Sequence, residues 1–381
     1  MNKDFIDIRN EPLITKKWHF KNTGLTNRKD DILITGANSF LGTHVVKVLQ
    51  QKWPGKIHLL VRGENSQTAI TKMETAFNAW NLGVFKTGYN TKIYFGEVCK
   101  PQMGLPTETY NELYNNVGFV LPLAMVPLYH IPYSRYQSQW LPELEQMINF
   151  CGGDNVKSLH YPSSYNANFF TTDEDFKQLN SNCWQSGYAG FKWVANRVIE
   201  NAFNQGLKGC IYDIPLVVGS VYDGRCPENY SIWHILDLFL QTGYFIPYAF
   251  RIIPVDILAE IIVSNLLEGK KGKGERFIRP VLKEPITHDH FRQFAKNLFG
   301  LNLTDRQTMY NAAVSKRRFS FMIPENFNAL LEKVNELPSV MPVNEITENL
   351  PDSSLVFLSN INSMFTKPKY QKYINHCNEL S

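Results

Sequence analysis

Short apolar runs alternate with amphipathic stretches through the first two thirds of the chain. Runs rich in β-branched and aromatic residues predict strands at residues 32–35, 57–61, 92–98, 118–124, 157–161 and 208–213. Helical spacing separates several of them, at residues 40–51, 138–151 and 183–203. Strands that alternate with helices indicate an α/β fold, a Rossmann doubly wound parallel sheet with helices on both faces.

Beyond residue 213 the alternation weakens and aromatic residues accumulate. The pattern predicts a smaller, mainly helical C-terminal portion, with helical spacing at residues 289–298 and 325–337. We therefore expect three parts: an N-terminal arm at 1–29, a Rossmann domain at 30–215 with 251–268 returning to it, and a separate lid or substrate-binding portion at 216–381. The most apolar region, 232–255, is interrupted by polar residues, which favours a buried or pocket-lining role over a membrane contact.

Composition narrows the class of protein. A net charge of +4 is too small to indicate nucleic acid or an anionic membrane as partner. The six cysteines form no C-x-x-C pair, which favours reduced thiols in a cytoplasmic protein over disulfides or a zinc site. No apolar run reaches the ~18 residues of a membrane span. The segment Thr287-His288-Asp289-His290 is typical of a capped helix start and not of a metal site.

The stretch from Ile32 to Gly42 joins the first predicted strand to the first predicted helix through small residues. In a dinucleotide-binding βαβ unit the first glycine allows a tight turn and the last lets helix and strand pack closely. The N–H groups of the helix N-terminus then bind a pyrophosphate. We therefore assign cofactor contacts to Thr35, Gly36, Asn38, Ser39, Phe40, Leu41 and Gly42.

Arg62 follows the second predicted strand, a little beyond the ~20 residues after the glycine turn where a ribose-binding residue is expected. An acidic residue there would favour NAD, whereas an arginine can pair with the 2′-phosphate of NADP in two hydrogen bonds. The alternative is a solvated arginine at a strand end. We predict an NADPH contact.

Tyr188 and Lys192 lie four residues apart in a predicted helix and so share one face. Carbonyl reduction by hydride transfer needs a proton donor at the oxygen, and Tyr188 can serve if Lys192 lowers its pKa from ~10 toward neutrality. Lys192 could also hold the nicotinamide ribose. Ser164 follows the fifth predicted strand and could share the hydrogen bond to the oxygen. We predict Ser164, Tyr188 and Lys192 as catalytic residues.

The chain resembles the thioester reductases, which are extended short-chain dehydrogenase/reductase domains that end nonribosomal peptide and polyketide assembly lines and carboxylic acid reductases. Fatty acyl-CoA reductases are close relatives. The motifs that carry the resemblance are Thr35–Gly42, Leu59-Leu60-Val61-Arg62, Gly96–Pro101, Tyr161-Pro162-Ser163-Ser164, Gly187–Ala195 and Ile253-Pro254-Val255-Asp256. The resemblance implies NADPH, a Rossmann domain and a C-terminal portion that meets the phosphopantetheine arm of a carrier protein.

Several positions depart from the pattern of that family. Ser39 replaces its middle glycine, and Leu121-Pro122-Leu123-Ala124 replaces a His-Asn-Ala-Ala-like segment beside the cofactor. Trp140 lies near the position of a supporting Asn, Asp213 near that of an Arg, and Glu97 replaces an Asp. These departures bear on cofactor affinity more than on the fold.

We predict an NADPH-dependent reductase that converts an acyl or peptidyl thioester, bound to a carrier protein or to CoA, to an aldehyde, with further reduction to the alcohol undecided. Two alternatives stay open. One is an extended reductase or epimerase acting on a free small molecule. The other is a catalytically impaired, reductase-like binding protein, which the departures favour. The intact Ser164, Tyr188 and Lys192 favour the enzyme. Because no adenylation or carrier sequence is present, we expect the substrate to arrive from another chain.

Overall fold

The computed structural model describes residues 7–21, 30–88, 90–125, 127, 131–178, 186–228, 230, 242–245, 251–282, 302–304, 308, 311–312, 337, 351–352, 356 and 359–360. The chain divides into two compact units. The first comprises residues 1–214, 258–280 and 340–344, and the second comprises 215–257, 281–339 and 345–381. Assignment of 216–381 to substrate and carrier binding stays a prediction.

The first unit is built on a seven-stranded parallel sheet with strand order β10-β6-β5-β4-β1-β2-β3. Its strands are β1 (Asp31–Thr35), β2 (Ile57–Val61), β3 (Thr91–Phe95), β4 (Val117–Pro122), β5 (Ser158–Pro162), β6 (Lys208–Tyr212) and β10 (Phe277–Ile278). Strand order reverses between β1 and β4. In open α/β sheets a ligand binds outside the carboxyl ends of the strands at this point.

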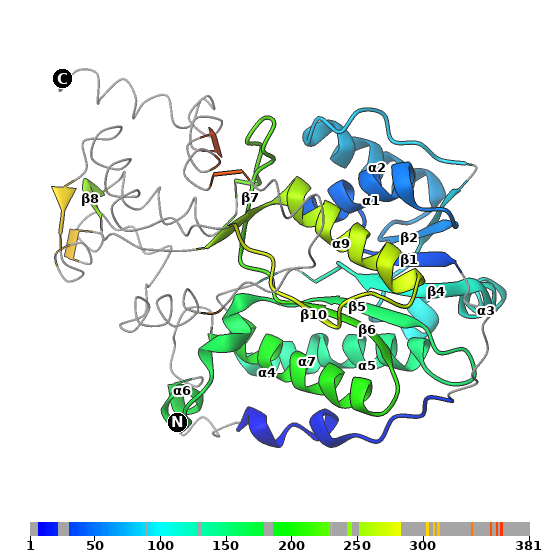
Figure 1. Ribbon diagram of the computed structural model, residues 1–381, viewed down its shortest axis with the longest axis horizontal. Coiled ribbons are helices and arrows are strands. Elements are labelled where there is room, and N and C mark those ends of the chain that lie inside the picture. The colour runs from blue at the N-terminus through cyan, green and yellow to red at the C-terminus, as the bar shows by residue number, and fades with distance from the viewer. Residues whose placement is uncertain are drawn as a thin grey trace. The chain divides into compact units, whose positions relative to one another are not determined.

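Helices cover both faces of this sheet, as Figure 1 shows, with α1, α2 and α9 on one side and α4, α5 and α7 on the other. The helices are α1 (Phe40–Lys52), α2 (Ser66–Ala79), α3 (Thr107–Asn116), α4 (Tyr133–Gln139), α5 (Leu141–Cys151), α6 (Asp173–Gln178), α7 (Ser186–Asn204) and α9 (Val255–Lys270). Burial on both faces explains why β1 and β2 are apolar runs, with Ile32, Leu33 and Ile34 fully buried. The predicted doubly wound Rossmann fold is therefore confirmed.

The predicted helix at 138–151 is wrong as a single element. The structure has two helices there, α4 and α5, which meet at Trp140. Pro142 lies in the first turn of α5, where its missing N–H costs nothing, but it cannot continue a preceding helix. Other predictions lie outside the described residues: the first residues of the helix at 183–203, the helices at 289–298 and 325–337, the segment 287–290 and most of 232–255.

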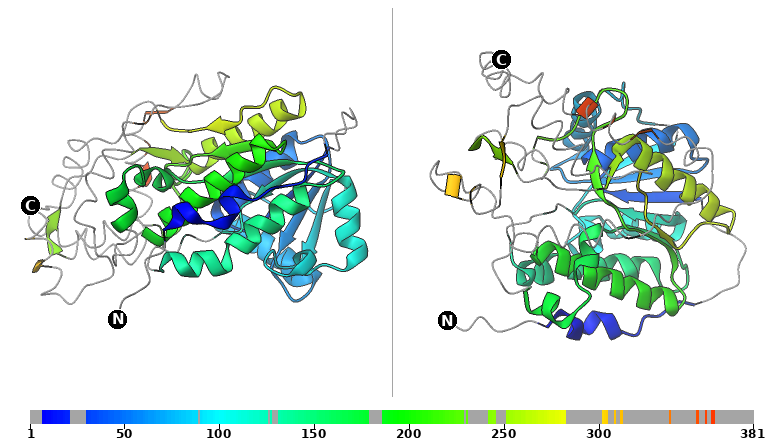
Figure 2. Two further views of the ribbon diagram at one scale, coloured as in Figure 1. Left: turned by 90° about the horizontal axis from the view of Figure 1, so that it is seen from below. Right: turned by 60° about the vertical axis from the view of Figure 1, so that its left-hand side comes forward.

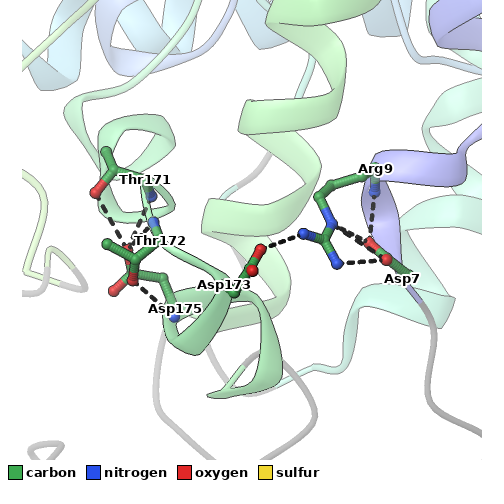
Figure 3. A network of polar contacts seen from close by, with 6 residues as sticks. All are labelled: Asp7, Arg9, Thr171, Thr172, Asp173 and Asp175. Atoms are coloured by element: carbon green, nitrogen blue, oxygen red, sulfur yellow. Dashed lines mark hydrogen bonds and ion pairs between the residues drawn. The ribbon is translucent and has the colours of Figure 1, made fainter.

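The N-terminal arm, residues 7–21, runs along the outer side of α7 (Figure 2). It contains two short 3-10 helices, η1 (Ile8–Asn10) and η2 (Pro12–Thr15). Gln205, just beyond α7, accepts from the backbone N of Trp18 at 2.8 Å and donates to the carbonyl of Lys16 at 3.0 Å. Figure 3 shows a second attachment, in which Arg9 bonds Asp7 and also Asp173 of α6. The arm is therefore part of the folded first unit.

The second unit contains two small parallel sheets. Strand β7 (Leu216–Val218) pairs with β9 (Ile252–Pro254), and β8 (Tyr244–Phe245) pairs with β11 (Asn302–Leu303). Asp256, in the first turn of α9, accepts from Ser220 Oγ at 2.6 Å and from the backbone N of Val221 at 3.0 Å. Across the described ranges, no helix combines the length and apolarity needed to cross a membrane.

Candidate active site

The turn between β1 and α1 is built for close backbone approach. Gly36 has φ +67°, and a Cβ there would lie 2.4 Å from the carbonyl of Leu123. A Cβ on Gly42 would lie 2.3 Å from the carbonyl oxygen of Gly36. Both positions therefore require glycine, the first for its left-handed backbone as well. Leu123, within the departing segment 121–124, also donates its N–H to Thr35 O at 2.9 Å, so this segment supports the turn.

Ser39 is the N-cap of α1. Its φ of −75° and ψ of 168° are extended, and its Oγ accepts from the backbone N of Gly42 at 3.0 Å. The side chain thus satisfies one of the amides that a helix N-terminus would otherwise offer to a ligand. Ser39, which replaces the family's middle glycine, therefore caps the helix. The backbone N–H of Gly42 that it binds is then not available to an anion.

Two buried hydroxyls lie at the carboxyl edge of the sheet. Thr35 ends β1 and Ser163 follows β5, and they are 0% and 4% exposed. Within the described part of the chain, neither hydroxyl oxygen has a hydrogen-bond partner. An unpartnered buried hydroxyl costs about 1–3 kcal/mol, so such groups mark sites where a ligand can complete the bonding. Together with the glycine turn, they fit a dinucleotide at this edge.

Arg62 lies directly after β2 and is exposed. Its carbonyl accepts from Lys72 Nζ at 2.7 Å, which ties the strand end to α2. The guanidinium also stabilises the charged form of Glu143, the acidic residue in the first turn of α5. This position suits a contact with the adenosine end of a cofactor bound at the β1–α1 turn. A contact of Arg62 with the 2′-phosphate of NADPH stays a prediction.

Lys192 is buried in the middle of α7, with 4% exposure. Its Nζ donates to the carbonyl of Pro162 at 2.6 Å and to the hydroxyl of Tyr161 at 3.1 Å. The ammonium also lies 5.9 Å from the ring centroid of Tyr188. Burial lowers the pKa of Lys192 to about 7, and the carboxylate of Glu143 opposes that decrease. Lys192 thus binds the end of β5 and lies beside the ring of Tyr188.

Tyr188 lies one turn before Lys192 on α7 and is 8% exposed. Its ring is part of an aromatic cluster, with the ring of Tyr136 at 6.1 Å between centroids. Tyr136 in turn lies 4.9 Å from Trp140 and 5.3 Å from Phe191. Where the family has a supporting Asn, this chain therefore has Trp140, which packs on Tyr136, the aromatic neighbour of Tyr188.

Ser164 is the N-cap of η4 (Tyr165–Phe169) and lies two residues after Pro162, whose carbonyl accepts from Lys192. Its Oγ accepts from the backbone N of Asn166 at 3.3 Å, so its own proton stays available for donation. The backbone N–H groups on either side of Ser164 donate to the last residue of β6 and to the segment that follows it. The structure thus links Lys192 with Tyr188 and with the strand end that precedes Ser164. The catalytic roles of the three residues stay predictions.

Two charged or polar residues of this region are not among the site residues predicted from the sequence. Tyr161 accepts from Lys192, and alternation along β5 could have indicated it, since positions 161 and 163 share a face. Glu143 interacts electrostatically with both Lys192 and Arg62, and burial raises its pKa to about 7. No local pattern marks Glu143, because its partners lie on other elements.

The remaining departures have structural explanations. The carboxylate of Asp213 accepts from Arg279 Nε at 2.8 Å, in a pair of which both members are buried. Glu97 donates its backbone N–H to Met103 and pairs with Lys100 at 3.4 Å, within the turn after β3. Among the residues described, no group of three or more His, Cys, Asp or Glu could hold a metal ion.

Several solved structures of similar fold are reductase domains. The terminal R domain of the myxalamid PKS-NRPS pathway has a TM-score of 0.67 at 16% identity, covering 94% of this chain and 96% of that one. A thiolation-reductase di-domain from an archaeal non-ribosomal peptide synthetase has a TM-score of 0.68 at 14% identity, covering 94% and 78%. At these identities the likeness establishes the fold.

Similar curated proteins are much longer than this chain. The large subunit of L-2-aminoadipate reductase of Penicillium chrysogenum is 23% identical over 289 residues, which are 69% of this chain and 20% of that protein. A linear gramicidin synthase protein of Brevibacillus parabrevis is 22% identical over 219 residues, 55% and 4% of the two. This chain therefore spans a fifth or less of these two relatives.

A protein-family model described as male sterility protein matches residues 34–262, more than half of the chain. The match begins within β1 and so includes the glycine turn, Arg62, Ser164, Tyr188 and Lys192. The chain therefore belongs to the male sterility protein family, a family of NAD(P)-dependent reductases of the extended short-chain dehydrogenase/reductase type.

Proposed function

We propose that this protein is an NADPH-dependent reductase that converts an acyl or peptidyl thioester to an aldehyde. The observation that carries the proposal is the contact set of Lys192, whose buried ammonium bonds the end of β5 beside Ser164 and lies next to Tyr188. A cation buried beside a phenol is the arrangement that stabilises a phenolate, and a neighbouring serine adds a second donor for the same substrate oxygen.

In the proposed reaction the thioester carbonyl oxygen accepts hydrogen bonds from Tyr188 and Ser164. The bound cofactor would supply a hydride to the carbonyl carbon. As negative charge develops on the oxygen, the two hydroxyls stabilise it, and Tyr188 transfers its proton with Lys192 compensating the charge left on the phenol. The resulting hemithioacetal loses the thiol, so that thioester, hydride and one proton yield aldehyde and thiol.

We assign NADPH rather than NADH on the basis of Arg62, an exposed cation at the end of β2, where an acidic residue would favour NADH. The turn Thr35–Gly42 would hold the pyrophosphate. We assign the phosphopantetheine arm of a carrier protein as the donor of the thioester, because a carrier-linked reductase domain is among the structures of similar fold. We also propose a cytoplasmic location, where thiols stay reduced, because Cys99, Cys151 and Cys210 are free thiols.

The test is NADPH oxidation with a short acyl-pantetheine thioester, followed by absorbance, with the aldehyde trapped by a hydrazine. We expect stoichiometric oxidation, aldehyde formation and thiol release. Tyr188→Phe removes one hydroxyl and keeps the ring, so it should reduce the rate ~10²–10⁴-fold and leave NADPH affinity nearly intact.

Three results would contradict the proposal. Oxidation that persists unchanged in Tyr188→Phe would exclude this tyrosine as the proton donor. Tight NADPH binding without turnover of any thioester would favour an enzyme that acts on a free small molecule. Capture of an acylated carrier protein without NADPH binding would favour the binding protein. The capping of Gly42 N by Ser39 is the feature of the structure that favours the binding protein.

A further inference from the structure

A buried ion pair joins the carboxyl ends of β6 and β10. Asp213 and Arg279 are 1% and 8% exposed, and Arg279 Nε donates to Asp213 Oδ2 at 2.8 Å. The backbone N of Asp213 also donates to the carbonyl of Ile278 at 2.8 Å. The two strand ends are therefore held together by both main-chain and side-chain bonds.

Asn168 connects this pair to the turn that follows Ser164. Its Nδ2 lies 3.0 Å from Asp213 Oδ2 and 3.2 Å from Oδ1, and it donates to the carbonyl of Tyr165 at 3.1 Å. One amide group thus bridges the buried carboxylate and the first residue of η4. Arg279 reaches the same residue, since its guanidinium carbon lies 5.8 Å from the ring centroid of Tyr165.

The main chain on both sides of Ser164 is hydrogen-bonded to the segment that contains Asp213. Ser163 N donates to the carbonyl of Tyr212 at 2.7 Å, and Tyr165 N donates to the carbonyl of Ile214 at 2.9 Å. Asp213 is the residue between these two acceptors. A displacement of Asp213 would therefore change both backbone hydrogen bonds that flank Ser164. The side chain of Asp213 also binds Asn168, which in turn donates to the carbonyl of Tyr165.

The electrostatics favour a fixed arrangement. Burial raises the pKa of Asp213, whereas Arg279 and Asn168 favour its charged form. A carboxylate in such an environment needs both partners, so its position is tightly coupled to theirs. The turn 164–169 is then held by three sets of contacts: the backbone bonds to the end of β6, the contact of Arg279 with Tyr165, and the side-chain amide of Asn168.

We infer that Asp213, Arg279 and Asn168 are positioning residues for the Ser164 hydroxyl, which they orient toward the substrate oxygen. The inference rests on the proposed function for its catalytic consequence. Removing a support should misplace the hydroxyl by up to about 1 Å, and a displacement of that size lowers the rate of a chemical step ~10²-fold. Cofactor affinity should remain, because these three residues lie outside the β1–α1 turn.

A double-mutant cycle separates positioning from a purely structural role. Asn168→Ala leaves the ion pair intact, and we expect it to lower kcat ~10- to 100-fold with NADPH affinity within about twofold. In a Ser164→Ala background the same substitution should have no further effect. Additive effects of the two substitutions would overturn the inference. Asn201→Ala is the matched control and should leave kcat unchanged. It removes a hydrogen bond from a side-chain amide of α7 to the carbonyl of Lys16 in the N-terminal arm.

The ion pair is tested in the otherwise wild-type protein. Arg279→Gln should lower kcat, and Arg279→Lys, which keeps the charge, should restore part of it. Equal kcat in both variants and wild type would show that Arg279 positions nothing.

A measurement without turnover keeps the inference testable if no thioester is reduced. Amide hydrogen exchange of peptides covering residues 163–169 should accelerate in Asn168→Ala and in Asp213→Asn, but not in Asn201→Ala. Unchanged exchange in the two variants would overturn the inference. Accelerated exchange in a protein that reduces no thioester would contradict the proposed function alone.

Discussion

At the scale of single residues, the charge at the end of β2 determines the expected cofactor choice. Arg62→Ala should weaken NADPH binding and leave NADH binding unchanged, because only NADPH carries the 2′-phosphate. A charge-assisted contact is worth ~1.5–3 kcal/mol, and the gap between the two affinities should narrow by that amount. Calorimetric titration with each cofactor measures it, with Arg62→Lys as the variant that keeps the charge. Equal affinity for both cofactors in the wild-type protein would exclude the assignment.

The electrostatic interaction between buried Lys192 and Glu143 predicts a pH dependence. The proposed reaction needs Lys192 protonated, and burial lowers its pKa to about 7, so kcat should fall as pH rises through that value. The carboxylate of Glu143 opposes the decrease. Glu143→Gln should therefore lower the pKa of Lys192 further and move the alkaline limb of the kcat profile to lower pH.

The measurement is kcat across the acidic, neutral and alkaline sides of that pKa for wild type and variant. Glu145→Gln is the control, because Glu145 lies on the same helix but pairs with Lys16 of the arm. An alkaline limb that stays in place in Glu143→Gln, or that moves to higher pH, would show that Glu143 does not act on Lys192.

At the scale of elements, the start of α1 serves both the fold and the cofactor. Ser39→Ala and Ser39→Gly both remove the bond to Gly42 N, and we expect the free energy of unfolding to decrease by ~1 kcal/mol for Ala and a few tenths for Gly. Both free the amide for the pyrophosphate, and Gly also removes the Cβ. NADPH affinity should therefore rise most in Ser39→Gly. Unchanged affinity in both variants would mean that the pyrophosphate does not approach this amide.

At the scale of the whole molecule, the N-terminal arm links distant parts of the first unit. Asn201 and Gln205, at the end of α7, both donate to the carbonyl of Lys16. Replacing both by Ala should lower the free energy of unfolding by ~1–3 kcal/mol and expose the arm to trypsin at Lys16 and Lys17.

Denaturant unfolding and limited proteolysis measure these two effects. Arg197→Ala, on the same helix, removes an exposed ion pair with Glu200 and should change stability by less than about 1 kcal/mol. A double variant that is as stable and as protease-resistant as Arg197→Ala would show that these bonds do not hold the arm.

The amino-acid sequence alone determined what depends on local period and turn chemistry. The apolar runs predicted the strands, the glycines predicted the turn after β1, and the four-residue spacing placed Tyr188 and Lys192 on one helix face. The cap at Ser39 was also within reach, since a serine before a helix is a local signal. The break at Trp140 was missed, although Pro142 indicated it.

Only the tertiary structure decided which residues meet across elements. Lys192 contacts Tyr161 and Pro162 about thirty positions earlier in the chain, and Asp213 contacts Arg279, which is 66 positions later. Such contacts follow from strand order and register, which short-range periodicity does not encode. Burial is likewise a property of the assembled layers, and it is burial that lowers the pKa of Lys192 and makes the carboxylate of Asp213 dependent on its two partners.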